Sequence, residues 1–110
     1  MMRAHLAALG CPLPVLQFVL RDPDGRFVSR NDFGWPDWKV VAEYDGMGKY
    51  TTLLKPGETA ADAIAREKAR EADIRAQGYE FTRFMAQDLR KPEKAAARLM
   101  KLLRANGYRG

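Results

Sequence analysis

The stretch "NDFGWPDWKVVAEYDG", residues 31–46, decides which fold this chain can adopt. Within it, residues 38–45 have the composition of a largely buried strand. Acidic side chains nevertheless accompany this strand: Asp32 lies near the end of the strand expected before it, and Glu43 and Asp45 lie near its own end. A small domain that places three acids beside its best core must have a chemical reason for them.

The elements expected on either side of this strand form a mixed sheet covered by helices. The sequence predicts helices over 2–9, 58–78 and 92–106 and strands over 15–22, 26–33, 38–45 and 79–84. The turn signal "DPDG" at 22–25 joins the first two strands in a hairpin, and Thr59 with Asp62 resembles a capping box. Closely joined strands are antiparallel, whereas the long helix between the third and fourth strands makes that pair parallel. We therefore expect an α/β fold (an α+β mixed sheet) in the order α-β-β-β-α-β-α, with residues 1–110 as one domain.

Composition narrows the class of protein. The chain has 110 residues, of which 46% are hydrophobic and 30% charged, as in an ordinary folded domain. Its net charge of +5 makes nucleic acid a candidate partner, although a globular domain can also simply be basic. The lone Cys11 excludes an intrachain disulfide, is a poor candidate nucleophile and suits a reducing cytoplasm. No uncharged apolar stretch reaches the roughly 18 to 20 residues of a membrane span, so we expect no membrane partner.

The three acids have two alternative explanations. Glu43 and Asp45 are two residues apart in a strand and therefore project from the same face, and Asp32 can join them from a neighbouring strand. Unpaired carboxylates repel one another unless a divalent cation lies between them, and carboxylates without imidazole or thiolate suit Mg²⁺ or Mn²⁺. In the alternative, Glu43 pairs with a Lys or Arg, and the two aspartates are turn residues.

The spacing of these acids resembles a known pattern. Asp32, ten residues, and then Glu43-Tyr44-Asp45 on consecutive strands resemble the PD-(D/E)XK nuclease superfamily. More closely, the chain resembles the very-short-patch-repair-like endonuclease domain found at the C-terminus of actinobacterial AbiEi-like proteins. The similar segments are "GCPLPVLQ" (10–17), "RDPDGRFVSRNDFGWPDWKVVAEYDG" (21–46), "KYTTLLKPGETAADAIAREKAREADIRAQGYEFTRF" (49–84) and "DLRKPEKAAARLMKLL" (88–103).

The resemblance implies a restriction-endonuclease-like fold and Mg²⁺- or Mn²⁺-dependent hydrolysis of phosphodiester bonds in DNA. Carried over by position, Asp32 and Glu43 would be metal ligands. Asp45 stands where many members have a catalytic lysine and would be a further ligand. The missing positive charge would come from Lys49 or Lys68. Contacts with DNA would come from Gln17, Lys49, Lys55, Lys68, Arg75 and Arg83.

The same resemblance leaves a second function open. The helix glutamate that the family places ahead of residue 1 has no copy in this chain, and Asp45 is not a lysine. The alternative is a catalytically impaired nuclease-fold module that binds DNA or a protein, in a phage, mobile element or toxin–antitoxin system. A homodimer would enlarge the DNA-binding surface and supply two sites. For Trp35 and Trp38, packing in the core or at its rim is favoured over stacking on bases.

Overall fold

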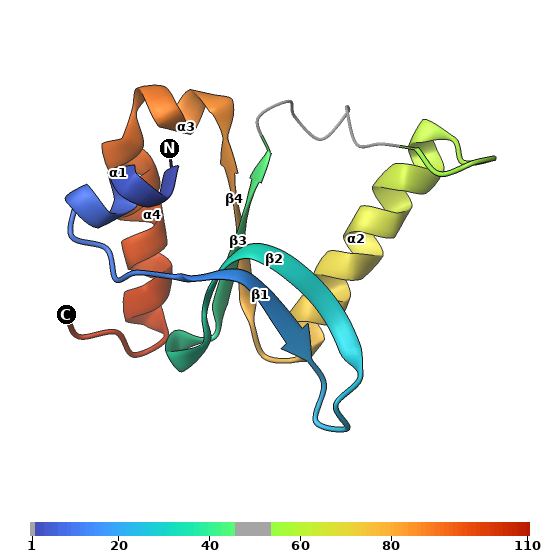
Figure 1. Ribbon diagram of the computed structural model, residues 1–110, viewed down its shortest axis with the longest axis horizontal. Coiled ribbons are helices and arrows are strands. Elements are labelled where there is room, and N and C mark those ends of the chain that lie inside the picture. Colours follow the sequence, from blue (N-terminus) through green and yellow to red (C-terminus); the bar gives the residue numbers. More distant parts are fainter. Residues whose placement is uncertain (1, 46–53) are drawn as a thin grey trace.

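The computed structural model describes residues 2–45 and 54–110, which form a four-stranded sheet between two layers of helices (Figure 1). The elements are α1 (Met2–Ala8), β1 (Val15–Arg21), β2 (Phe27–Trp35), the 3₁₀ helix η1 (Pro36–Trp38), β3 (Val40–Asp45), α2 (Ala60–Ala76), β4 (Glu80–Met85), α3 (Ala86–Arg90) and α4 (Pro92–Ala105). The strand order is β1-β2-β3-β4, antiparallel for the first two pairs and parallel for β3 with β4. The expected mixed α/β fold is confirmed.

The strands bury a different set of side chains on each face of the sheet. On one face, Val40 of β3 and Phe84 of β4 join Leu99 of α4 in the larger core, which α1 also covers. On the other face, Val41 of β3 packs with Ile74 of α2. Because neighbouring residues of a strand point to opposite faces, β3 is buried from both sides over its first half. Within the described residues, no helix is both long and apolar enough to span a membrane.

Two local features differ from the sequence-based expectation. The third strand begins at Val40 and not at residue 38, because Pro36 starts a 3₁₀ turn and Lys39 takes a left-handed backbone conformation with φ 53°. The short helix α3 was not expected. It starts directly after β4, where the Met85 N–H donates a hydrogen bond to Asp88 Oδ2 at 2.6 Å. Both features come from turns that strand and helix periodicity does not reveal.

The start of α2 is fixed by the expected capping box and by an ion pair. Thr59 Oγ1 accepts a hydrogen bond from the Asp62 N–H, and Asp62 Oδ2 accepts one from the Thr59 N–H, so the capping box is confirmed. Glu58 accepts two hydrogen bonds from the Arg66 guanidinium, at 3.0 Å each. These bonds, together with one from the Lys55 N–H, lower the pKa of Glu58 from 4.5 to about 2.

We predict that the Arg66→Ala variant raises the pKa of Glu58 back toward 4.5, whereas Arg75→Ala leaves it unchanged. The folded-state pKa is depressed, so the pair stabilises the fold above the unfolded pKa of 4.5. That contribution is lost as the pH falls from 4.5 toward 2. Carboxyl NMR titration of the wild type and both variants measures the shift. A Glu58 pKa near 4.5 in the wild type would contradict this assignment.

Gly34 allows β1 and β2 to pack closely. A Cβ atom at this position would lie 2.4 Å from Cγ and 2.6 Å from Cβ of Phe18, which is far inside van der Waals contact. The Phe18 Cβ is attached to the backbone and cannot rotate away from the added methyl group. Phe18 is itself held in place because it packs with Val41 and Phe81 beneath α2. Glycine is therefore required sterically at position 34.

We predict that Gly34→Ala destabilises the fold by about 1–3 kcal/mol, the usual cost of overpacking a core. Urea denaturation monitored by tryptophan fluorescence measures the change. In a Phe18→Gly background the same substitution is expected to cost less, because the clashing ring carbons and the clashing Cβ atom are both absent. Equal costs in the two backgrounds would show that the clash with Phe18 is not the cause.

Candidate functional site

The acids of interest lie where β2 and β3 separate. The pairing between these strands runs from Trp35 with Val40 to Phe33 with Ala42. Continuing this register would place Asp32 opposite Glu43, yet β2 there remains paired only with β1, and β3 only with β4. The Asp32 carboxylate spans the opening, because its Oδ2 accepts a hydrogen bond from the Tyr44 N–H at 2.9 Å.

Glu43 faces α2 and is paired with a cation. Val41, two residues earlier in β3, packs with α2, so Glu43 and Asp45 project from that same face. Glu43 Oε2 forms an ion pair with the guanidinium of Arg70 of α2. The same guanidinium donates a hydrogen bond to the Arg30 carbonyl oxygen at 3.0 Å. Arg70 thereby connects α2 to both separated strands, and the alternative in which Glu43 pairs with a basic residue is observed.

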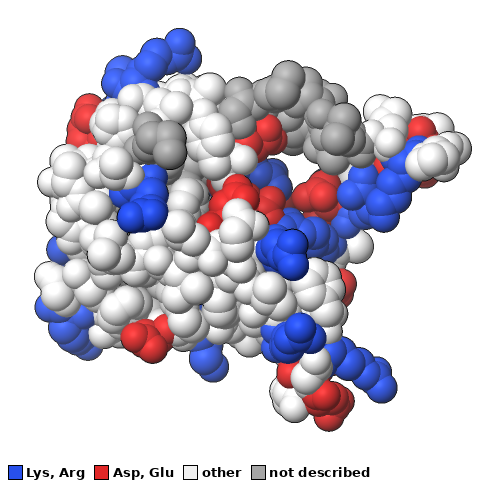
Figure 2. Space-filling view, in the orientation of Figure 1, with Lys and Arg blue, Asp and Glu red and all other residues white. Residues whose placement is uncertain are grey.

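Further charges continue this pairing between α2 and the sheet. Arg83 of β4 lies 3.2 Å from Glu71 Oε1 and 3.8 Å from Glu67 Oε2. Arg70 Nη1 lies 3.6 Å from Glu67 Oε2. Partial burial, and the nearby charge of Arg83, lower the pKa of Arg70, but a guanidinium remains charged at neutral pH. Figure 2 shows acidic and basic side chains together in a hollow between α2 and the rest of the molecule.

Gln17 lies beside Asp32. In β1, Leu16 pairs with Phe33 and Phe18 pairs with Asn31, so the register places Gln17 opposite Asp32. Gln17 has φ 51°, a left-handed conformation that costs a residue other than glycine about 1–3 kcal/mol. The irregular backbone of β1 therefore lies next to the point where β2 leaves β3.

The structure gathers some of the residues expected at a site and leaves others apart. Asp32, Glu43, Gln17 and Arg83 lie on adjacent strands. The side chain of Arg75 is 52% exposed and pairs with Glu71 at 3.6 Å, while Lys55 and Lys68 are exposed to solvent. Asp45 is partly buried at the end of β3, in register with Met85. Lys49 lies outside the described residues.

The acids have the donor chemistry of a magnesium site but are not arranged as three ligands. Over residues 2–45 and 54–110, no group of three or more His, Cys, Asp or Glu side chains is placed to hold one metal ion. Mg²⁺ commonly uses only one or two protein carboxylates and retains several waters, so Asp32 and Glu43 are a chemically sufficient pair. Arg70 then competes directly for Glu43.

Arg70 is the central residue that the sequence-based site did not contain. Ala63 and Ile74 are the buried residues of α2, and Glu67 and Arg70 lie between them on the side of the helix that faces the sheet. That charged interruption of an apolar stripe was the available signal. Asn31, buried beside Asp32, was also missed. It donates a hydrogen bond to Ser29 Oγ at 3.0 Å and lies 3.4 Å from Arg70 Nη2.

Several other notable side chains contribute to packing. Trp35 is buried and its Nε1 donates a hydrogen bond to the Pro12 carbonyl oxygen at 2.9 Å. The ring of Trp38 packs edge-on against Tyr108, with centroids 4.9 Å apart. The favoured packing role of both tryptophans is confirmed. Cys11 is buried, and its burial raises the pKa of the thiol, which makes it a poor nucleophile.

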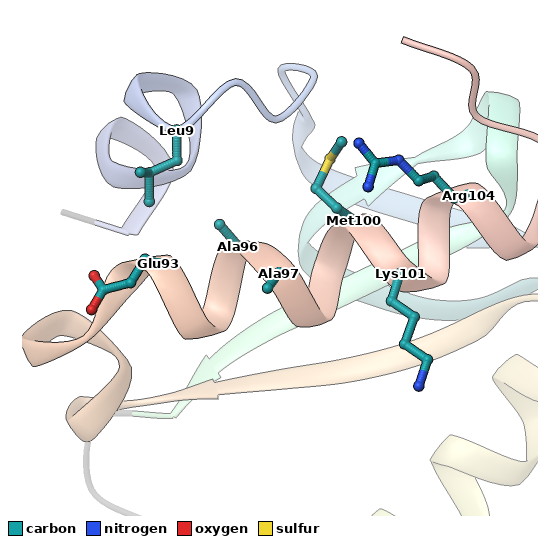
Figure 3. Close-up of a pocket in the computed structure, with 7 residues that line it drawn as sticks. All are labelled: Leu9, Glu93, Ala96, Ala97, Met100, Lys101 and Arg104. Carbon is teal, nitrogen blue, oxygen red and sulfur yellow. The ribbon is translucent and has the colours of Figure 1, made fainter.

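Two surface pockets adjoin α4. One, of about 490 Å³, lies along the outer side of α4 beside the end of α1 (Figure 3), and is lined by Leu9, Glu93, Ala96, Ala97, Met100, Lys101 and Arg104. The other, of about 470 Å³, lies where α3 meets the start of α4. The first is lined by four apolar and three charged residues, whereas all six residues that line the second are polar or charged.

Two curated proteins from Mycobacterium tuberculosis are similar to this chain. Uncharacterized protein MT2308 (strain CDC 1551 / Oshkosh) and Uncharacterized protein Rv2248 (strain ATCC 25618 / H37Rv) are each 32% identical to it over 95 residues, or 86% of this chain. The chain spans about a third of the length of each relative (32%). No protein-family model and no solved structure matches it.

We predict that Arg70 and Glu43 couple more strongly than Arg75 and Glu71, because the Arg75 side chain is 52% exposed. Both side chains of the first pair are only about a fifth exposed (23% and 20%), so solvent screens them less. A double-mutant cycle with Arg70→Met and Glu43→Gln is expected to give a coupling energy of about 1–2 kcal/mol. The matched cycle with Arg75→Met and Glu71→Gln is expected to give about 0.5 kcal/mol or less. Urea denaturation measures both, and equal coupling energies would contradict the assignment.

Proposed function

We propose that this chain is a metal-dependent endonuclease domain that hydrolyses phosphodiester bonds in DNA. The observation that carries the proposal is the placement of Asp32 and Glu43 on either side of the opening between β2 and β3. Gln17 next to Asp32, and the excess of basic residues in the chain, agree with a polyanionic substrate. The sequence resemblance to PD-(D/E)XK nucleases supplies the reaction class.

In this proposal Asp32 and Glu43 would hold Mg²⁺ or Mn²⁺, and Asp45 would become a further ligand only after its side chain moved, because the three acids are not placed together around one ion. Such an ion, when bound, supplies Lewis-acid polarisation of a phosphate oxygen and an activated water. The chain's own residues orient the reaction. The Tyr44 N–H fixes the Asp32 carboxylate, and Arg83 supplies positive charge near the acids. Lys49 and Lys68 remain the proposed replacements for the family's lysine.

Arg70 imposes a condition on this mechanism. Its guanidinium pairs with Glu43 Oε2, and its positive charge would lie close to an ion bound at the other oxygen, so Arg70 opposes metal binding while it stays in this position. Arg70 has an alternative carboxylate partner in Glu67, at 3.6 Å. A move toward Glu67 would leave Glu43 open to the ion while keeping the arginine charge close to the acids and to a bound phosphate.

We predict that Arg70→Gln tightens Mn²⁺ binding by roughly fivefold, since releasing a partly exposed ion pair is worth about 1 kcal/mol. Glu43→Gln and Asp32→Asn are expected to abolish measurable binding. Isothermal titration with Mn²⁺, supported by electron paramagnetic resonance of the free ion, measures all four proteins. Lower affinity in Arg70→Gln would show that Arg70 supports the ligands and does not compete with the ion.

We predict that the wild type nicks or linearises supercoiled plasmid in Mg²⁺ or Mn²⁺. Asp32→Asn and Glu43→Gln are expected to lose at least roughly a hundredfold in rate, because loss of a direct ligand exceeds the effect of outer residues. Asp73→Asn, which removes the same charge from an exposed position of α2, serves as the matched control. Absence of cleavage by the wild type, or equal cleavage by Asp32→Asn, would refute the nuclease proposal.

The second candidate is a nuclease-fold module that binds DNA or a protein without cutting. The observation that favours it is the ion pair of Glu43 with Arg70, which uses a proposed ligand for structure. This module would bind DNA equally well in EDTA and in Mg²⁺, with a strong dependence on salt. Its setting would be cytoplasmic, in a phage, mobile element or toxin–antitoxin system. Light scattering with and without DNA would test whether the chain forms the proposed homodimer.

A further inference from the structure

A basic pocket lies where α3 meets α4, outside the group of acids. Its volume is about 470 Å³, and its walls are formed by Gln87, Asp88, Arg90, Lys91, Lys94 and Arg98. Four of these six side chains are cations and one is a carboxylate. None of them belongs to the site described above, and none was selected by the sequence pattern. The composition of the walls indicates a small, strongly anionic ligand.

The one carboxylate in the pocket is already committed to the fold. Asp88 is buried, and its Oδ2 accepts a hydrogen bond from the Met85 N–H at 2.6 Å. The same oxygen accepts a second hydrogen bond from Arg98 Nη2 at 3.2 Å. Asp88 therefore neutralises at most one of the four cations. The pocket therefore keeps an excess of positive charge, which only solvent and salt ions balance when no anionic ligand is bound.

Arg98 is held in place by its contacts and still has N–H donors available for a ligand. Besides Asp88, its Nη2 donates a hydrogen bond to the Arg83 carbonyl oxygen at 3.1 Å. Its guanidinium also lies over the ring of Phe84, 5.8 Å from the centroid. The side chain remains 44% exposed, and a guanidinium has five N–H donors in a fixed plane. Arg98 can therefore present a preorganised donor surface to a phosphate oxygen.

The start of α4 adds the positive end of its helix dipole to the pocket. Lys91 is the N-cap residue of this 14-residue helix and provides no side-chain hydrogen bond to its first turn. Pro92 at the first helical position has no N–H, and the Lys94 N–H donates to the Lys91 carbonyl oxygen at 3.1 Å, so the helix end favours an anion mainly through its partial positive charge. Lys91 and Lys94 of the pocket flank this helix end. Side-chain charge and helix polarity thus act on the same small volume.

The pocket also lies at the same end of the sheet as the acids. β3 and β4 are parallel, and Asp45 is in register with Met85, the last residue of β4. The helix α3 begins at the next residue, so the pocket follows directly from the carboxyl end of β4. Glu43 and Asp45 face α2, whereas α4 covers the other face of the sheet, so a strand of nucleic acid would meet both features if it passed over this end of the sheet from one face to the other.

We propose that this pocket binds a phosphate group, and that the group belongs to the nucleic-acid strand on which the acids act. The second half of this statement rests on the proposed function. The pocket would hold a neighbouring phosphate and so set which bond of the strand reaches Asp32 and Glu43. A free phosphate compound offers the same oxygens to the same donors, so the two sources of phosphate must be separated by experiment.

The test measures binding of a fluorescein-labelled DNA duplex by anisotropy, in EDTA so that no strand is cut, over a series of salt concentrations. Lys91→Ala/Lys94→Ala is compared with Lys101→Ala/Arg104→Ala, which removes two charges from the same helix at the pocket of Figure 3. The first variant is expected to bind more weakly and to flatten the plot of log K against log salt by about 1. The second variant, and the charge-keeping Lys91→Arg/Lys94→Arg, are expected to match the wild type.

Amide NMR shifts on adding inorganic phosphate to the wild type separate the sources. Amide shifts at Lys91, Lys94 and Arg98, together with a flatter salt dependence of DNA binding in Lys91→Ala/Lys94→Ala than in the wild type, support binding of a phosphate of the strand. The flatter salt dependence alone also supports it. Amide shifts on adding phosphate, with the same salt dependence of DNA binding in the variant and the wild type, support the pocket but assign it to a free phosphate compound. The inference would be overturned if phosphate caused no amide shifts and the variant either had the same salt dependence of DNA binding as the wild type or neither protein bound DNA. Plasmid cleavage is read separately, so a pocket that fails here leaves the nuclease proposal standing, and the reverse also holds.

Discussion

The hydrogen bond from the Tyr44 N–H to Asp32 Oδ2 bridges β2 and β3 where their pairing ends, and the arrangement of the candidate site depends on this bridge. Beyond Phe33 and Ala42, β2 and β3 no longer pair, and unpaired backbone groups inside a fold carry a free-energy cost. A side-chain carboxylate satisfies one of them and lets the two strands diverge. This opening gives the sheet an interior edge, where polar chemistry can lie next to a packed core.

The divergence also explains why α2 carries charges on the side that faces the sheet. Near its C-terminal end, Ile74 packs with Val41 and Phe81 in a small apolar core. Toward the opening, Glu67, Arg70 and Glu71 replace apolar residues and pair with Glu43 and Arg83. Ion pairs of this kind stabilise a fold less than apolar contacts do, because desolvation offsets much of their attraction. These ion pairs beneath α2 therefore add little stability for their number, which is consistent with the polar ligand of the proposed function.

Much of the fold follows from the sequence, because local signals agree with the final packing. The runs around Val19 and Val41, the turn at 22–25 and the capping box at Thr59 locate strands and helices correctly. The site is less predictable. Spacing placed Asp32 and Glu43 near each other, but the partner of Glu43 comes from a helix 27 positions later and is set by how α2 lies on the sheet. The interrupted apolar stripe of α2 indicates that charges face the sheet, but no periodicity in the sequence shows which of them meets Glu43. The basic pocket was missed for a similar reason, because it forms across a helix junction that was not expected.

The left-handed backbone of Gln17 has a consequence for the behaviour of the molecule at high concentration. β1 is an edge strand, and the side chains of Val15 and Leu16 on it are about half exposed. A regular apolar edge invites strands of other copies to add to it and is a common origin of aggregation. The reversed φ at Gln17 interrupts the even row of N–H and C=O groups directly after these two residues. A residue placed beside the acids thus also limits how far a second sheet could extend from this edge.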